Sequence, residues 1–387
     1  MSRPHAGQLR SPVRTAVVGV STSPICGVRD HATLLSAALT SESCDCSTHW
    51  LDRSQVSPRA AYTEIHAWTR ALAAELVAEQ PDATLLHYSV FSYSFRGLPV
   101  FVAPTLSALR DAGAPLVTIL HEFIYPWRRD GLHGTAWAVS QRLLLISVMR
   151  ASAAVVTTTD FQAEWLASRS WLPKRPVAVA PVFSNLPPPA EAARPGHRGA
   201  VIGLFGYGYG EATVALVLDA LGIVRERDRE ARLRLLGAPG RSSSAAAVWL
   251  AQASNRGLDD ALSFSGTIPP AELSDALATC DVLLFVDPLG PNPRKTTLAA
   301  SLASGRPVVA LDGPRRWRKL SDAKAAWIVT PEPEPLAEAL ATLVAEERQR
   351  VLLGARGRSF ARESMSAAGS ARTVADLLRR VTGMTGT

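Results

Sequence analysis

Short apolar runs alternate with helical stretches twice along this 387-residue chain, and this repeated alternation limits its possible folds more than any other feature. Runs such as Leu116–Leu120 and Val282–Val286 hold consecutive apolar residues rather than apolar and polar residues in turn. Such runs are typical of parallel strands that helices cover on both faces. The chain is therefore predicted to be an α/β protein with two Rossmann-like, doubly wound parallel sheets, one in each half.

The predicted strands form one set in each half of the chain. Those of the first half are residues 15–20, 84–88, 116–120, 153–157 and 177–180, with helices expected at 30–39 and 62–79. Those of the second half are residues 200–205, 233–236, 262–265, 282–286, 307–311 and 327–329. Each set is large enough for a sheet and a core of its own.

A proline-rich segment without periodicity, residues 185–199, separates the two sets of strands. Segments of this composition usually connect domains. We expect an N-terminal Rossmann-like domain at residues 1–185, a linker at 186–199 and a second such domain at 200–365. A helix and a short tail are expected to complete the chain at 366–387.

Composition excludes several classes of protein. Hydrophobic residues make up 47% and charged residues 19%, as in ordinary folded proteins, and no apolar run reaches the ~18 residues of a membrane-spanning helix. The net charge of +7 is spread over both halves without a Lys/Arg block, which argues against nucleic-acid binding. Nothing in the composition indicates an oligomeric state.

The beginning of the chain and its cysteines bear on location. No apolar core precedes the first expected strand, so the start does not have the pattern of a secretory signal. The four cysteines form neither a Cys-x-x-Cys pair nor a plausible zinc set with nearby histidines; they are Cys26, Cys44, Cys46 and Cys280. These observations predict a cytoplasmic protein.

The most unusual motif is the strand-helix-strand unit at residues 290–313. Arg294 and Lys295 stand at the expected start of a helix, followed by Thr296 and Thr297. A helix N-terminus already carries partial positive charge, so two cations there are favourable only beside an anion. A phosphate or diphosphate bound by free backbone N–H groups would be such an anion. The alternative is a solvated basic loop that a threonine caps.

Other loops that follow predicted strands are also candidates, because ligands of open α/β sheets bind beyond the carboxyl ends of strands. Gly27, after the first strand, would let backbone approach a ligand, or would simply form a tight turn. His121 and Glu122 end the third strand beside aromatic residues; such a histidine is either functional or structural. Gly206 opens a glycine-rich turn that matches neither the dinucleotide fingerprint nor a P-loop. The loop at 266–270 could offer backbone groups to a planar ring.

Four segments together resemble the retaining glycosyltransferases of the GT-B fold, specifically their large fourth family (glycosyl transferases group 1). Residues 24–31 (PICGVRDH) are similar to the run with which many members begin their first helix, although Arg29 and His31 replace a glycine and a tyrosine. Leu120-His-Glu122 resembles the family's strand-terminal His-Asp or His-Glu. Residues 264–268 resemble its base-contacting loop, and 303–309 (ASGRPVV) its Ala-x-Gly-x-Pro-Val-Val segment.

The resemblance implies two domains that face each other across a cleft, with the acceptor on the N-terminal side and the nucleotide sugar on the C-terminal side. It implies transfer of a sugar from a nucleotide diphosphate to a saccharide or small-molecule acceptor with retention of configuration. A leaving-phosphate oxygen would then accept the acceptor's proton, so that no protein base is required. The implied catalytic residues are His121, Arg294 and Lys295. The implied donor-binding residues are Gly27, Gly206, Gly266, Thr267, Ile268, Arg294, Lys295, Thr296 and Thr297.

On the acceptor side the resemblance points to Arg29, Glu122 and Trp127, with at most peripheral contact with a membrane. The nucleotide sugar would be a co-substrate rather than a cofactor. The Asp-x-Asp motif of the metal-dependent transferase fold does not occur in the sequence, so no metal is expected.

The sequence departs from the family in one place. Many members have two glutamates eight residues apart before the segment at 303–309, but this chain has Asn292 and Ala300 there. Arg294–Leu298 instead resembles the Arg-Arg-Gly-Ser-Leu run of a subgroup. Two alternatives remain: a degenerate GT-B protein that binds without turnover, and a nucleotide-sugar epimerase or hydrolase on the same fold.

Overall fold

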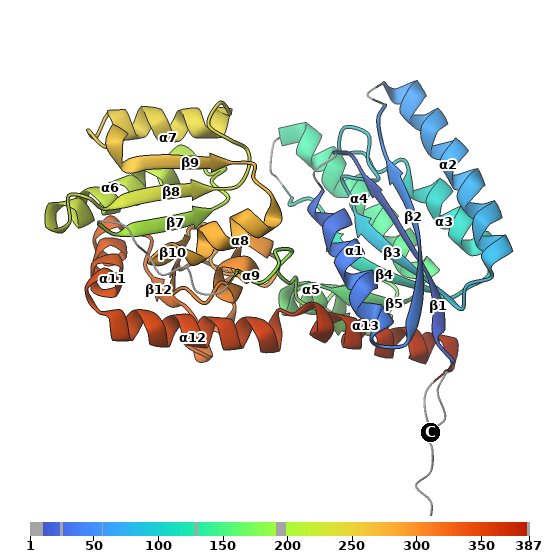
Figure 1. Cartoon of the computed structure of the whole chain (residues 1–387). Coiled ribbons are helices and arrows are strands. Elements are labelled where there is room, and N and C mark those ends of the chain that lie inside the picture. The colour runs from blue at the N-terminus through green and yellow to red at the C-terminus, as the bar shows by residue number, and fades with distance from the viewer. Residues whose placement is uncertain (1–10, 24–25, 56, 128–130, 191–198, 385–387) are drawn as a thin grey trace, which may run out of the picture. The chain divides into compact units, whose positions relative to one another are not determined.

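The computed structural model describes residues 11–23, 26–55, 57–127, 131–190 and 199–384. The chain divides into two compact units, each built around one parallel sheet of six strands. The first unit comprises Met1–Pro181 together with Ala367–Thr387, and the second comprises Val182–Ser366. Both predicted sheets are present (Figure 1).

In the first unit the strand order is β2-β1-β3-β4-β5-β6, and all pairs are parallel. The strands are β1 (Val13–Ser21), β2 (Cys44–Asp52), β3 (Ala83–Ser89), β4 (Leu116–Glu122), β5 (Ser152–Thr157) and β6 (Val177–Val179). The helices are α1 (Gly27–Thr40), α2 (Pro58–Glu79), α3 (Val102–Asp111), α4 (Gly131–Ala151), α5 (Asp160–Ala167) and α13 (Ala367–Thr382). From β1 the chain first adds β2 on one side and then adds β3 to β6 on the other. The β1/β3 pair is therefore the topological switch point of the sheet.

In the second unit the order is β12-β11-β10-β7-β8-β9, again all parallel, and the switch point is the β7/β10 pair. The strands are β7 (Val201–Phe205), β8 (Arg232–Leu236), β9 (Leu262–Gly266), β10 (Val282–Phe285), β11 (Val308–Leu311) and β12 (Trp327–Val329). The helices are α6 (Glu211–Arg227), α7 (Ser244–Ser254), α8 (Pro270–Ala278), α9 (Thr296–Ala303), α10 (Arg318–Asp322), α11 (Pro333–Ala345) and α12 (Glu347–Ser364), with a 3₁₀ turn at Asp259–Ala261.

Both faces of the second sheet are buried, which explains its uninterrupted apolar strands. Along β10, Val282 and Leu284 pack into one core with α6, α7 and α11, whereas Leu283 and Phe285 pack into the other with α8, α9 and α12. Because successive side chains of a strand point to opposite faces, a strand between two helical layers must be apolar at every position.

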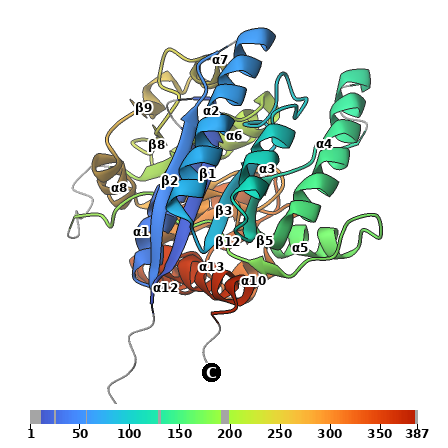
Figure 2. The ribbon, with the colours of Figure 1, turned by 90° about the vertical axis from the view of Figure 1, so that its right-hand side faces the viewer.

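Two features of the first unit were not predicted. β2 is an edge strand with a largely polar sequence, CDCSTHWLD, so it carries no apolar run. The C-terminal helix α13 lies against α1 and also contacts β3, β5 and β6, so it belongs to the first unit (Figure 2). Of the expected linker, residues 186–190 and 199 belong to the second unit, and 191–198 lie outside the described residues.

Candidate functional site

The carboxyl edge of the second sheet brings together most of the predicted donor-binding residues. Gly206 follows β7 with φ +73°, and its N–H donates to Leu236 O at 3.0 Å. Gly237, the next residue after β8, forms an isolated bridge with Gly266 at the end of β9. Three neighbouring strands thus end in glycines with positive φ, at Gly206, Gly237 and Gly266, and leave backbone along one edge uncovered by Cβ atoms.

The loop after β10 meets this row at the switch point. A Cβ placed on Gly206 would lie 3.3 Å from Thr297 Cγ2, so the glycine-rich turn and the start of α9 are in direct contact. α9 begins at Thr296 with Lys295 as its N-cap, no side chain caps its first amides, and its first turn has no acidic residue. Uncapped amides at the switch point of a parallel sheet form a ready anion site.

The loop that leads to α9 is tightly fixed. Asn292 Nδ2 donates to Gly290 O at 3.1 Å, and its Oδ1 accepts from the N–H of Arg294 at 3.2 Å. Gly290 packs so closely against Gly313 that a Cβ on Gly313 would lie 2.3 Å from Gly290 N. Asn292 therefore holds the loop's shape, at the position where the resembling family often has a glutamate.

Lys295 forms an ion pair with a buried carboxylate of the same loop, Asp287. Its Nζ lies 2.7 Å from Asp287 Oδ2, and the carboxylate side chain is only 9% exposed. Asp287 Oδ1 also accepts from the N–H of Leu289 at 2.9 Å. The charge of Lys295 is thus largely compensated within the protein, which leaves the uncapped amides at the start of α9 as positive groups for a diphosphate. Asp287 had no signal in the sequence that marked it as Lys295's partner.

The remaining donor-side residues of the second unit differ in exposure. Thr267 is exposed and Ile268 is half-buried against the core that contains α8 and α9. Gly266 has open space where a Cβ would be. A flat ligand group placed on this loop would meet backbone and small side chains.

In the first unit, His121 at the end of β4 is the centre of a group of three buried histidines. His87 Nδ1 and His121 Nε2 are 3.1 Å apart, and the ring of His31, the fifth residue of α1, lies 5.2 Å from that of His121. Exposed fractions are 6% for His31, 1% for His87 and 9% for His121. β1, β3 and β4 are adjacent strands, so their carboxyl ends bring the three residues together.

Burial keeps the imidazoles of His31 and His87 neutral. It lowers the pKa of His31 to about 4, and it lowers that of His87 well below its ordinary value, helped by the neighbouring His31. His87 Nε2 is buried and has no hydrogen-bond partner among the described residues. A proton on that atom would leave an unsatisfied N–H at a cost of about 1–3 kcal/mol. We therefore assign the proton of His87 to Nδ1, which donates to His121 Nε2; this leaves Nδ1 as the protonated nitrogen of His121.

The same three histidines are a possible metal-ligand set among the described residues. One ring nitrogen of each lies within 4.8 Å of the others, and no carboxylate or thiolate belongs to the group.

The other residues predicted in the first unit are placed differently. Gly27 begins α1, is exposed, and has nothing near the position of a Cβ. Arg29 forms an ion pair with Asp52, so its charge is already compensated. Glu122 is exposed, and its backbone carbonyl accepts from Val90 N–H. Trp127 is 53% exposed and lies under the guanidinium of Arg142.

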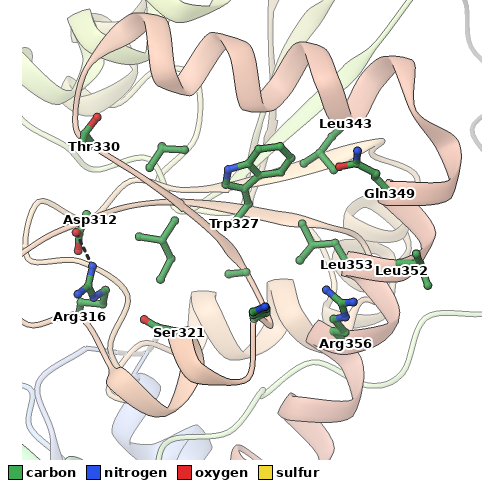
Figure 3. A pocket seen from close by; sticks show the side chains of 14 residues that line it. Asp312, Arg316, Ser321, Trp327, Thr330, Leu343, Gln349, Leu352, Leu353 and Arg356 are labelled. Carbon is green, nitrogen blue, oxygen red and sulfur yellow. Dashed lines mark hydrogen bonds and ion pairs between the residues drawn. The ribbon is translucent and has the colours of Figure 1, made fainter.

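A cavity of about 600 Å³ lies elsewhere in the second unit, along edge strand β12 (Figure 3). Trp327 projects into it together with Leu343 of α11 and Leu353 of α12, and the Asp312–Arg316 ion pair, 2.7 Å long, closes one side. None of the predicted site residues lines it. It lies away from the β7/β10 switch point, so we do not identify it with the donor site.

The comparisons with known proteins agree with this geometry. The architecture is the GT-B fold, which is also that of Anabaena HepE solved with UDP-glucose. HepE is 15% identical to this chain with a TM-score of 0.68, and the match covers 94% of this chain and 99% of HepE. Sucrose-phosphate synthase from Thermosynechococcus elongatus is 13% identical with a TM-score of 0.69, covering 96% and 100%. A putative UDP-N-acetylglucosamine 2-epimerase from Listeria monocytogenes is 11% identical with a TM-score of 0.63, covering 97% and 98%.

Residues 199–346 match the family model described as Glycosyl transferases group 1. That range contains the switch point, the glycine row and the start of α9. No curated protein matches the chain by sequence. The second unit therefore matches a glycosyltransferase domain, and the fold of the chain is that of the GT-B structures. No helix among the described residues combines the length and the hydropathy that a membrane span requires.

Proposed function

We propose that the protein transfers a sugar from a nucleotide-diphosphate donor to a saccharide or small-molecule acceptor, with retention of configuration. The observation that carries the proposal is the contact between Gly206 and Thr297 at the switch point of a group 1 domain. The glycine-rich turn and the uncapped start of α9 meet there, as binding of a diphosphate would require. The similar fold of Anabaena HepE, solved with UDP-glucose, supports the donor class.

In this proposal the second unit stabilises the leaving diphosphate. The amides of Thr296 and Thr297 and the guanidinium of Arg294 offset the charge that develops on the leaving oxygen. Lys295 contributes mainly by holding the loop through Asp287. The planar base of the nucleotide binds to the loop formed by Gly266, Thr267 and Ile268. Gly206 has no side chain, so the donor can approach the backbone closely there.

The first unit provides His121, held by His87 at 3.1 Å. With its proton on Nδ1, neutral His121 acts as a hydrogen-bond donor to a sugar hydroxyl rather than as a general base. The acceptor's proton then passes to an oxygen of the leaving phosphate, so no protein carboxylate is needed. Like His121, the first-unit residues Gly27, Arg29 and Glu122 contribute to this part of the site. The reaction requires no metal. We further propose a cytoplasmic location, with an acceptor from secondary metabolism or cell-surface glycan synthesis.

Turnover with a panel of sugar nucleotides tests this function. The protein is incubated with UDP-, GDP-, ADP- and dTDP-sugars, with and without acceptor pools, and the released nucleotide and sugar products are analysed. A transferase releases nucleotide only, or much faster, when acceptor is present, and the new glycosidic bond has the donor's configuration. Acceptor-independent release would identify a hydrolase, and interconversion of the donor sugar an epimerase. Nucleotide binding without turnover would identify a degenerate binding protein.

A further inference from the structure

Helix α4 of the first unit is apolar on two faces, and only one of them is covered by the sheet. Leu145, Val148 and Met149 are buried in the core with strands β1, β3 and β5. On another side, Val139 and Leu143 are 43% and 61% exposed, although each is a large aliphatic residue. The positions 139, 143 and 146 follow helical spacing, so they line a second stripe along the helix.

This second stripe forms one wall of a cavity of about 480 Å³ within the first unit. The other walls come from the residues after β4, from α5 and from the segment that follows α5. Three tryptophans, three aliphatic residues and two arginines line it, and none of the described lining residues is acidic. They are Trp127, Val139, Arg142, Leu143, Ile146, Trp165, Arg169 and Trp171.

An aromatic ring lies against each of the two arginines, and backbone carbonyls also hold Arg142. The guanidinium carbon of Arg142 lies 4.1 Å from the centre of the Trp127 ring, and that of Arg169 lies 4.8 Å from the centre of the Trp165 ring. Arg142 Nη1 also donates to the carbonyls of Tyr125, at 3.0 Å, and Ala138, at 2.8 Å. Both cations are therefore positioned before any ligand arrives.

Neither cation is neutralised within the described part of the chain. No carboxylate lies within ion-pair distance of Arg142 or Arg169 among the described residues. Arg169 Nε is buried and has no hydrogen-bond partner there. Burial lowers the pKa of Arg142, and the adjacent charge of Arg169 lowers it further. An anion between the two guanidiniums would relieve this repulsion and satisfy the buried N–H.

We propose that this cavity is the acceptor subsite for a molecule in which a phosphate or carboxylate is joined to a flat ring or a hydrocarbon body. The anion would lie between Arg142 and Arg169, and the apolar body would lie on the faces of Trp127 and Trp171 and on the aliphatic stripe of α4. That the ligand is the acceptor rests on the proposed function. The binding chemistry itself rests only on the cavity.

Binding of 2-naphthyl phosphate to the full-length protein tests the subsite, measured by calorimetry. Inorganic phosphate and 2-naphthol, which each carry half of the proposed chemistry, are the comparison ligands. We expect the combined molecule to bind at least about tenfold more tightly than either half, because both parts of the cavity contribute. Equal binding of inorganic phosphate would reduce the site to an adventitious anion site and overturn the proposal.

Arg169→Gln, alone and with Arg142→Gln, is the decisive variant, because glutamine keeps most of the volume and removes the charge. Arg142 also bonds to two backbone carbonyls, so the single Arg169 variant covers the case in which the double variant misfolds. The matched control is Arg70→Gln with Arg110→Gln, two exposed arginines on α2 and α3. Affinity for 2-naphthyl phosphate should fall at least about fivefold for Arg169→Gln and remain within about twofold for the control.

Two further results separate this proposal from its alternatives. Co-sedimentation with vesicles of phosphatidylcholine and phosphatidylglycerol, without binding of soluble naphthyl phosphate, would show a membrane-contact surface and overturn an acceptor cavity. Binding of naphthyl phosphate that depends on Arg169 in a protein that turns over no sugar nucleotide would disprove the proposed function while the anion site stands. Unchanged affinity in Arg169→Gln would disprove the site whatever the turnover.

Discussion

The pairing of Lys295 with Asp287 gives the sharpest prediction about the site's construction. Their charged atoms are 2.7 Å apart, with the carboxylate side chain 9% exposed and the lysine 43% exposed. If Lys295 mainly fixes the loop, Lys295→Met should lower the stability of the second unit and weaken nucleotide binding only modestly. Arg294→Gln should weaken nucleotide binding strongly and change stability little, because the proposed function assigns its guanidinium to the diphosphate.

The size of the stability effect follows from the exposure of the pair. Removing one partner of a fully buried pair costs about 3–5 kcal/mol, and an exposed pair contributes only about 0.2–1 kcal/mol. Because the lysine is half exposed and water screens it, we expect Lys295→Met to lower the free energy of unfolding by about 1–2 kcal/mol. For a unit of this size that corresponds to a fall in melting temperature of roughly 2–8 °C.

A double-mutant cycle checks the reasoning. Lys295→Met, Asp287→Asn and the double variant are compared by urea unfolding followed by circular dichroism. The double variant should be more stable than the sum of the two single effects predicts, since it leaves no unpaired carboxylate. If the two effects simply add, and nucleotide affinity falls equally in Lys295→Met and Arg294→Gln, the pair does not fix the loop and Lys295 contacts the ligand directly.

Three more predictions concern the glycine turn, the histidines and metal. Gly206→Ala should cost about 1–2 kcal/mol, since its φ is +73°, and should weaken binding of nucleoside diphosphate because the new Cβ meets Thr297; unchanged binding in calorimetry would argue against close approach there. The pKa of His31 is about 4 when folded against an ordinary 6.5, so the unfolded chain takes up its proton first. Its contribution to stability should be lost as the pH falls below 6.5, by about 2 kcal/mol between pH 7 and pH 5; His31→Asn removes this contribution, the exposed His133→Asn does not, and the loss that comes from His87 remains in both variants. Sugar transfer should survive chelation by EDTA, and loss of activity that Zn²⁺ restores would instead assign a metal to the three histidines.

The sequence predicts those parts of the fold that follow from burial on both faces. Central strands such as β10 have four consecutive buried residues, so their apolar runs are visible without any knowledge of pairing. β2 lies at the sheet edge, and most of its residues are partly buried or exposed, so the requirement for apolar residues is correspondingly weak. The return of α13 to the first unit has no local signal, because it depends on contacts with α1, β3, β5 and β6, which all lie far earlier in the sequence.

The site shows the same division. The start of α9 was predicted at Thr296 from the polar residues that precede an apolar stretch, and the helix begins there. Its end was predicted from Gly305, which has φ +78° and follows the last turn. His121 was predicted from its place at the end of a strand. Its partners His31 and His87 were not, since they become neighbours only once the order β1-β3-β4 is known.

Binding of nucleoside diphosphates to the intact protein tests the central claim most directly, namely that the start of α9 and the Gly206 turn form a diphosphate site. Titration calorimetry with UDP, GDP, ADP and dTDP should reveal saturable binding of at least one of them. In Arg294→Gln with Thr297→Val that affinity should fall at least about tenfold while the melting temperature of the free protein stays the same. If none of the four nucleotides binds, or if the double variant binds as tightly as the parent protein, the diphosphate site is not there.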